Sequence, residues 1–309
     1  MDNSTIHILD PNGEVMLILR NPNAPFAVWP GNSNADTPST PSTNNPPAQP
    51  HEPEEIHQYR VSAAHLTFVS PVFVRALYGN WKEALALREQ GWVELRLSNW
   101  DRDALLLLLE IIHCQNARVP SALSLEQLAK VAVIADYYDC KDVLGFFSGV
   151  WIARLKERGV PRAWSRDLML WLWVCWYFGA AEEFEAASAV AIGQGEGWIE
   201  ALGLPIPDRV LAQMNERRQH GIQALIDVLY ERLKQYYDGT WGCNFDCSAM
   251  LLGTLAKQMR RMGLRLSPPT SPFPALSYVG IRDTANAFRP PRWYAFTRQP
   301  QKHKLLCLA

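Results

Sequence analysis

The sequence lacks the dense cysteines, the apolar leader and the charge excess that mark several large classes of protein. Its six cysteines are spread over 309 residues, whereas secreted disulfide-rich domains are short and dense in cysteine. The N-terminus has no basic stretch followed by an apolar one, so we expect no signal peptide. A net charge of −1 predicts no general attraction to nucleic acid or to membranes.

Long apolar runs are also missing. The longest uncharged apolar run covers residues 168–181, and it is shorter than the roughly 20 residues that a membrane-spanning helix needs. We therefore expect a soluble intracellular protein with no membrane partner. The sequence leaves open whether the compartment is the nucleus or the cytoplasm.

Motifs for catalysis and cofactor binding are absent as well. No G-x-S-x-G, H-E-x-x-H or P-loop lysine motif occurs. Cys243 and Cys247 could form half of a zinc site, but no second pair of ligands has a usable spacing. The glycine-rich stretch 193–197 follows an Ala-rich helix instead of a strand, so we interpret it as a turn between helices. We expect no enzyme, no metal site and no cofactor.

What the chain does contain is enough apolar material for two modest domains. Hydrophobic residues make up 48% of the chain, and 12 of its residues are Trp. Near the N-terminus, the β-rich runs 6–9 and 15–20 flank Asp10-Pro-Asn-Gly13, which predicts a hairpin. The stretch from about 30 to 55 is rich in Pro, Ser, Thr and Asn, and we expect it to be a disordered insertion.

Strand and helix signals alternate from residue 56 to residue 155, and only helix signals follow. The pattern predicts strands at 56–61 and 92–97 and a helix and turn over 62–78. Asn99 or Asp101 can cap the next helix, and Ser124-Leu-Glu-Gln127 is a capping box. Further helices are expected in the segments 143–156, 167–178, 182–192, 208–237 and 248–262. Beyond Ser267 we expect an irregular, Pro-rich basic tail, so the predicted domains are 1–155, 156–266 and 267–309.

The ordered series of motifs in residues 6–29 and 56–155 resembles the BTB/POZ fold. A strand leads into a helix with a Ser-Pro-x-Phe turn, and its pattern residues are Val61, Leu66, Ser70, Phe73 and Leu77. Several runs are similar to ascomycete (fungal) BTB proteins, namely Asp10-Pro-Asn-Gly-Glu-Val15, Arg20-Asn-Pro-Asn-Ala-Pro-Phe-Ala-Val-Trp29, Gly79-Asn-Trp-Lys-Glu-Ala84 and Ala135-Asp-Tyr-Tyr-Asp-Cys140. The implied fold is α+β, with a small sheet and helical hairpins, followed by an all-α region.

The resemblance implies an interaction module that forms dimers with itself or with another BTB protein. It also implies an adaptor role, in which the module links a client protein to a cullin-3 ubiquitin ligase. The residues that the resemblance suggests for the interaction surface are Glu14, Leu17, Leu19, Ser70, Phe73, Leu77, Trp81, His113, Asn116 and Arg118.

Two departures from the BTB pattern narrow this expectation. Many BTB domains carry His and a basic residue where this chain has Ser62 and Ala63, so the charged pair of the dimer groove would keep only Glu14. The segment 112–119 also lacks the Tyr-x-Gly ending that is common in ligase adaptors.

The basic tail supports an alternative function. Between Lys257 and Lys304 the only acidic residue is Asp283, and aromatic residues alternate with the basic ones. This composition is compatible with single-stranded nucleic acid, and the candidate contacts are Arg289, Arg292, Arg298, Lys302 and Lys304. The alternative is a transcription-associated or chromatin-associated factor. A solvated tail is the simpler interpretation, because no folded nucleic-acid reader accompanies these charges.

Overall fold

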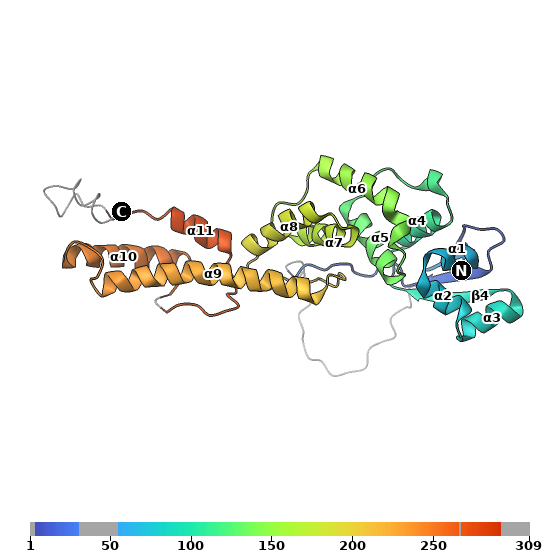
Figure 1. The fold of residues 1–309 in the computed structure, drawn as a ribbon, viewed down its shortest axis with the longest axis horizontal. Coiled ribbons are helices and arrows are strands. Elements are labelled where there is room, and N and C mark those ends of the chain that lie inside the picture. Colours follow the sequence, from blue (N-terminus) through green and yellow to red (C-terminus); the bar gives the residue numbers. More distant parts are fainter. Residues whose placement is uncertain (1–3, 31–54, 266, 292–309) are drawn as a thin grey trace, which may run out of the picture. The chain divides into compact units, whose positions relative to one another are not determined.

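The computed structural model describes residues 4–30, 55–265 and 267–291, and over these residues the chain is an α+β protein (Figure 1). The described part contains eleven α-helices and a four-stranded mixed sheet. Its contacts divide the chain into two compact units, which we describe separately. The first unit comprises residues 1–187 and 201–206, and the second comprises 188–200 and 207–309.

The sheet of the first unit has the strand order β1-β3-β2-β4. Its strands are β1 (Ser4–Ile8), β2 (Val15–Arg20), β3 (Ile56–Val61) and β4 (Val93–Ser98). Strand β3 is parallel to β1 and antiparallel to β2, while β2 is parallel to β4. The predicted hairpin is therefore wrong, because β3 lies between the two strands that were expected to pair.

The turn at residues 10–13 does reverse the chain, but its contacts are with the end of β3. The backbone N–H groups of Leu9 and Asp10 both donate to the carbonyl of Arg60, at 2.9 and 3.2 Å. A Cβ on Gly13 would lie only 2.5 Å from the carbonyl oxygen of Val61. A larger residue would push the turn off β3, so this position requires glycine.

Seven helices and the start of an eighth complete the first unit. They are α1 (Ala63–Val69), α2 (Pro71–Tyr78), α3 (Lys82–Gln90), α4 (Arg102–Ile112), α5 (Leu125–Tyr137), α6 (Gly145–Arg158), α7 (Arg166–Phe178) and α8 (Ala181–Gln194). Two short 3-10 helices, η1 (Asn116–Arg118) and η2 (Lys141–Leu144), follow α4 and α5. The sequence did not predict α3, whose first turn lacks a side-chain cap.

Side-chain caps fix several of these helix starts. The predicted capping box is confirmed, with Ser124 and Gln127 exchanging hydrogen bonds at the start of α5. Of the two candidates for α4, Asp101 is the cap. Ser70 caps α2 by accepting from the N–H of Phe73, and its hydroxyl also donates to the carbonyl of Tyr138 at 2.5 Å. This one serine therefore ties the start of α2 to the end of α5.

The second unit is helical in its described residues. It contains the end of α8, together with α9 (Asp208–Tyr237), α10 (Phe245–Arg261) and α11 (Tyr278–Asn286). Helices α10 and α11 both pack on α9 (Figure 1). The bounds of α9 match the predicted helix, and Ile222, Ile226 and Leu233 of its predicted seam are buried. The glycine-rich stretch lies at the end of α8 and before α9, as predicted.

The expected irregular tail is wrong for residues 278–286, which form α11, whereas residues 267–277 and 287–291 have no helix or strand. Ser277 caps α11 by accepting from the N–H of Gly280 at 3.1 Å. Phe273 and Ile281 enter the core beside Ile222 and Ile226. The prolines of this segment lie before the cap or after the end of α11, so they shape the flanking loops without interrupting the helix. The predicted insertion at about 30–55 lies almost entirely outside the described residues.

A buried arginine holds this segment in place. The side chain of Arg218 on α9 is 0% exposed. Its Nε donates to the carbonyl of Gly195 at 2.8 Å, and its Nη1 donates to that of Pro272 at 2.9 Å. Its Nη2 donates to the carbonyls of Phe273 and Leu276 at 3.0 and 2.7 Å. One guanidinium thus joins α9 to two separate stretches of backbone.

Candidate functional site

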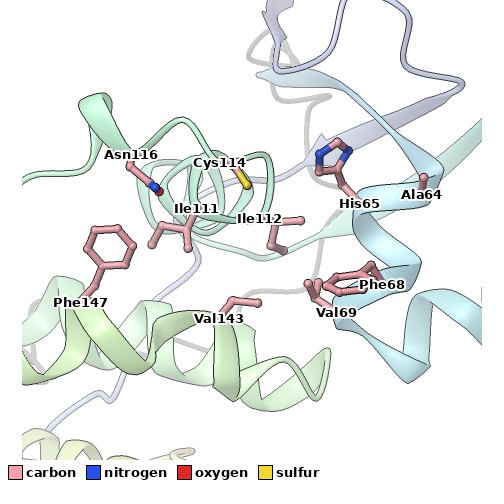
Figure 2. Close-up of a pocket in the computed structure, with 10 residues that line it drawn as sticks. All are labelled: Ala64, His65, Phe68, Val69, Ile111, Ile112, Cys114, Asn116, Val143 and Phe147. Carbon is pink, nitrogen blue, oxygen red and sulfur yellow. The ribbon is translucent and has the colours of Figure 1, made fainter.

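An apolar groove in the first unit is a candidate site. It has a volume of about 590 Å³ and lies between α1, the end of α4, and the segment from η2 to α6 (Figure 2). The lining residues are Ala64, His65, Phe68, Val69, Ile111, Ile112, Cys114, Asn116, Val143 and Phe147. Most of these side chains are apolar, so the groove suits an apolar side chain of a partner better than a charged ligand.

Phe68 is the most unusual residue of the groove. Helix α1 buries Ala63 and Leu66 on one face, whereas Phe68 is 90% exposed. Figure 2 shows its ring beside Val69, on the side of the groove that α1 forms. An aromatic ring that is left in water next to an apolar groove is typical of a surface that another molecule covers.

Behind the groove lining, His113 follows α4, is 9% exposed and stacks on the lining residue His65 with ring centroids 4.9 Å apart. Its Nε2 lies 3.0 Å from the backbone nitrogen of Ser62, and its Nδ1 lies 2.8 Å from the carbonyl oxygen of Leu109. The ring must accept from the first group and donate to the second, so these bonds assign the proton of the neutral ring to Nδ1. Burial lowers the pKa of His113, which keeps the ring neutral near pH 7.

These lining residues offer little chemistry of their own. His65 is the only one with an ionisable nitrogen, and no carboxylate is among them. Within the ranges that the structure covers, no three His, Cys, Asp or Glu side chains come together to hold a metal ion. The imidazole of His65 and the thiol of Cys114 are the lining groups that could transfer a proton or act as a nucleophile, and no carboxylate among the lining residues orients either of them.

Most of the predicted interaction surface is in fact core. Leu17, Leu19, Phe73 and Leu77 are buried, and Ser70 and His113 are buried as well. Leu17 and Leu19 lie on the face of β2 that the helices cover, and Phe73 stacks on Tyr138 with ring centroids 4.5 Å apart. These residues fit the BTB pattern because they pack in the core. The prediction that they form an interaction surface is therefore wrong.

Four of the predicted residues are exposed, and their surroundings differ. Asn116 lines the groove. Glu14 accepts from the backbone N–H of Ala63 at 3.1 Å, next to the groove wall. Arg118 lies 3.8 Å from Glu110. Trp81, which is 67% exposed, precedes α3 and is not among the lining residues. The structure therefore brings Glu14 and Asn116 near the groove, together with the buried His113.

The sequence reasoning missed the residues that shape the groove walls, among them Phe68, Val69, Ile112, Val143 and Phe147. One signal for Phe68 was available. Ala63 and Leu66 predict the buried face of α1 by their spacing of three, and Phe68 falls on the opposite side of so short a helix. An apolar residue on the wrong face of a helix indicates a contact surface.

The predicted nucleic-acid contacts fall mostly outside the described residues. Only Arg289 is described, and its side chain is exposed while its backbone N–H donates to Oε1 of Gln258. Arg292, Arg298, Lys302 and Lys304 lie in the undescribed C-terminal stretch.

Among the helices of the described ranges, none is both long enough and apolar enough to cross a bilayer.

No family model matches the sequence, and no curated protein is significantly similar to it. The resemblance to BTB/POZ proteins therefore stays a prediction.

Proposed function

We propose that the first unit is a BTB-type module that binds other proteins and acts as a dimeric scaffold or adaptor. The chain order of its elements supports this proposal. Strands β2 and β3 lead into α1 and α2 through the Ser70-Pro71 turn, and β4, α4 and α5 follow. This is the order that the sequence resemblance implies.

The observation that carries the proposal is the exposed ring of Phe68 beside the apolar groove. Exposed aromatic side chains contribute much of the binding free energy at protein interfaces, because a partner removes them from water. A second copy of the chain is the partner that we propose for this face. A dimer would place Phe68 of each copy against the α1 face of the other, as the two-fold symmetry of most dimers requires.

Replacing Phe68 with Asp should weaken self-association by about 30-fold, since losing a central aromatic contact costs about 2 kcal/mol. Light scattering coupled to size-exclusion chromatography of the full chain would measure this. Phe245 is a suitable control because it is similarly exposed, at 84%, and lies in the second unit. F245D should leave the oligomeric state unchanged. A monomeric wild-type chain at micromolar concentration, or an F68D variant that dimerises normally, would contradict the dimer proposal.

The adaptor role makes a separate prediction. Wild-type protein should retain purified cullin-3 in a pull-down, because an adaptor must hold the ligase scaffold and its client together. F68D should also be tested, since it shows whether the ligase contact depends on the same face. If wild-type protein repeatedly fails to retain cullin-3, the adaptor role is excluded and the scaffold role remains.

A further inference from the structure

The first turn of α1 depends on side chains from elsewhere in the fold. The first backbone N–H groups of a helix have no partner within the helix, and other groups must satisfy them. Here the N–H of Ser62 donates to Nε2 of His113, and the N–H of Ala63 donates to Glu14. The N–H of His65 has a longer bond of 3.5 Å to the Ser62 hydroxyl. His113 therefore supplies one of the two shorter bonds at the start of α1.

Protonation of His113 is incompatible with this bond. A doubly protonated imidazole has no acceptor left, because both ring nitrogens carry a proton. Nδ1 already donates to Leu109, so the second proton would have to sit on Nε2 and face the N–H of Ser62. The bond would then break, and a buried N–H would lose its partner.

The charged groups around His113 come from two other elements. The ring of His65 on α1 stacks on it with centroids 4.9 Å apart and an angle of 22° between the planes. Asp10, in the turn between β1 and β2, also acts on the ring through its charge. Asp10 favours the protonated ring and His65 opposes it. Burial is the largest influence, and it lowers the pKa of His113.

We propose that His113 is an acid-sensitive latch on α1, and that its protonation frees the N–H of Ser62 and loosens the groove wall that carries His65 and Phe68. The latch itself follows from the hydrogen bonds around the ring. Only its consequence for partner binding depends on the proposed function of the groove.

The direction of the pH effect follows from proton linkage. In the unfolded chain His113 titrates near its usual pKa of about 6.5, and in the folded chain burial holds the pKa below that value. The stabilisation is therefore complete above about pH 6.5, and it is lost as the pH falls from there towards the folded pKa. Acid therefore breaks the hydrogen bond between the N–H of Ser62 and His113.

Amide hydrogen exchange of the full chain between pH 7.5 and pH 5 would test the latch. After correction for the intrinsic exchange rate, protection of the first turn of α1 should fall on the order of tenfold at the acid end, which is about the effect of leaving one buried N–H without its partner. Protection in α7, which is remote from the ring in sequence and buried, should change much less. An unchanged first turn of α1 would overturn the proposal.

Two variants separate the latch from a general loss of stability. H113Q keeps an acceptor but cannot be protonated, so its α1 protection should not depend on pH. H65Q removes the exposed imidazole and keeps the latch, so it should retain the pH response. An NMR titration of the wild-type His113 ring gives the same answer if H113Q does not fold, because the proposal requires α1 opening to follow that titration. These measurements need no partner, so they stand whether or not F68D shows a dimer.

Discussion

Replacing Arg218 with Met should lower the free energy of unfolding of the second unit by about 3 to 5 kcal/mol, because the change leaves four carbonyls without this donor, two of them in buried hydrogen bonds. The guanidinium donates to four carbonyl oxygens at 2.7 to 3.0 Å. Methionine fills a similar volume but donates nothing. Each carbonyl would lose a charge-assisted bond, and the bonds to Gly195 and Phe273 are buried.

The four carbonyls belong to segments that have little regular structure of their own. Gly195 follows α8, and residues 272–276 precede α11. Pro272 and Phe273 lie in no helix or sheet, so their carbonyls have no partner in regular secondary structure. The fixed N–H groups of the Arg218 guanidinium supply the hydrogen bonds instead. R218K should recover little stability, because one ammonium group cannot match this fork.

Urea denaturation, with hydrogen exchange at residues 272–281, would measure the loss. Arg217 is the matched control, because it is the neighbouring arginine and its side chain is exposed. R217M should change the free energy of unfolding by less than about 0.5 kcal/mol. If R218M and R217M cost the same, the guanidinium does not hold the segment before α11.

The sequence predicted the elements whose signals are local. Ser124 and Gln127 stand three residues apart, and that spacing is sufficient to form the capping box at α5. The seam of α9 repeats at helical spacing, so the extent of that helix also followed from the pattern. In each case the deciding residues are neighbours in the chain.

The errors arose where distant segments meet. A turn at Asp10–Gly13 predicts that the chain reverses, but it does not show that β3 inserts between the two strands. Likewise, proline suggested an irregular tail, while the contact that orders residues 272–276 comes from Arg218, about 55 residues earlier in the chain. Sequence patterns carry no signal for such long-range donors.

The groove was unpredictable for the same reason. Its walls come from segments around residues 64–69, 111–116 and 143–147, and none of these patterns shows which side chains face a shared hollow. The BTB resemblance directed attention to Phe73 and Leu77, which are conspicuous in the pattern because they are core residues. Phe68 is the most exposed of the large hydrophobic residues in the same region. A binding surface is thus better sought where an apolar residue departs from its helix's buried face.

Trp151 should be the most sensitive position for the shape of the groove. Its ring on α6 is 0% exposed and stacks on Phe147, with centroids 5.6 Å apart. Phe147 in turn lines the groove. The indole Nε1 donates to the carbonyl of Pro120 at 2.8 Å, which ties α6 to the segment before α5.

W151A should therefore lower the free energy of unfolding of the first unit by about 3 to 5 kcal/mol, the usual cost of removing a large buried ring. W151F should cost about 1 to 3 kcal/mol, because it keeps most of the packing and loses the bond to Pro120. F146A is the control, since Phe146 is the exposed neighbour on the same helix. Urea denaturation measures the three costs, and methyl NMR of Val143 shows whether the groove changes shape. If W151A costs no more than F146A, α6 is not anchored by this ring, and Phe147 must be held in the groove by other contacts.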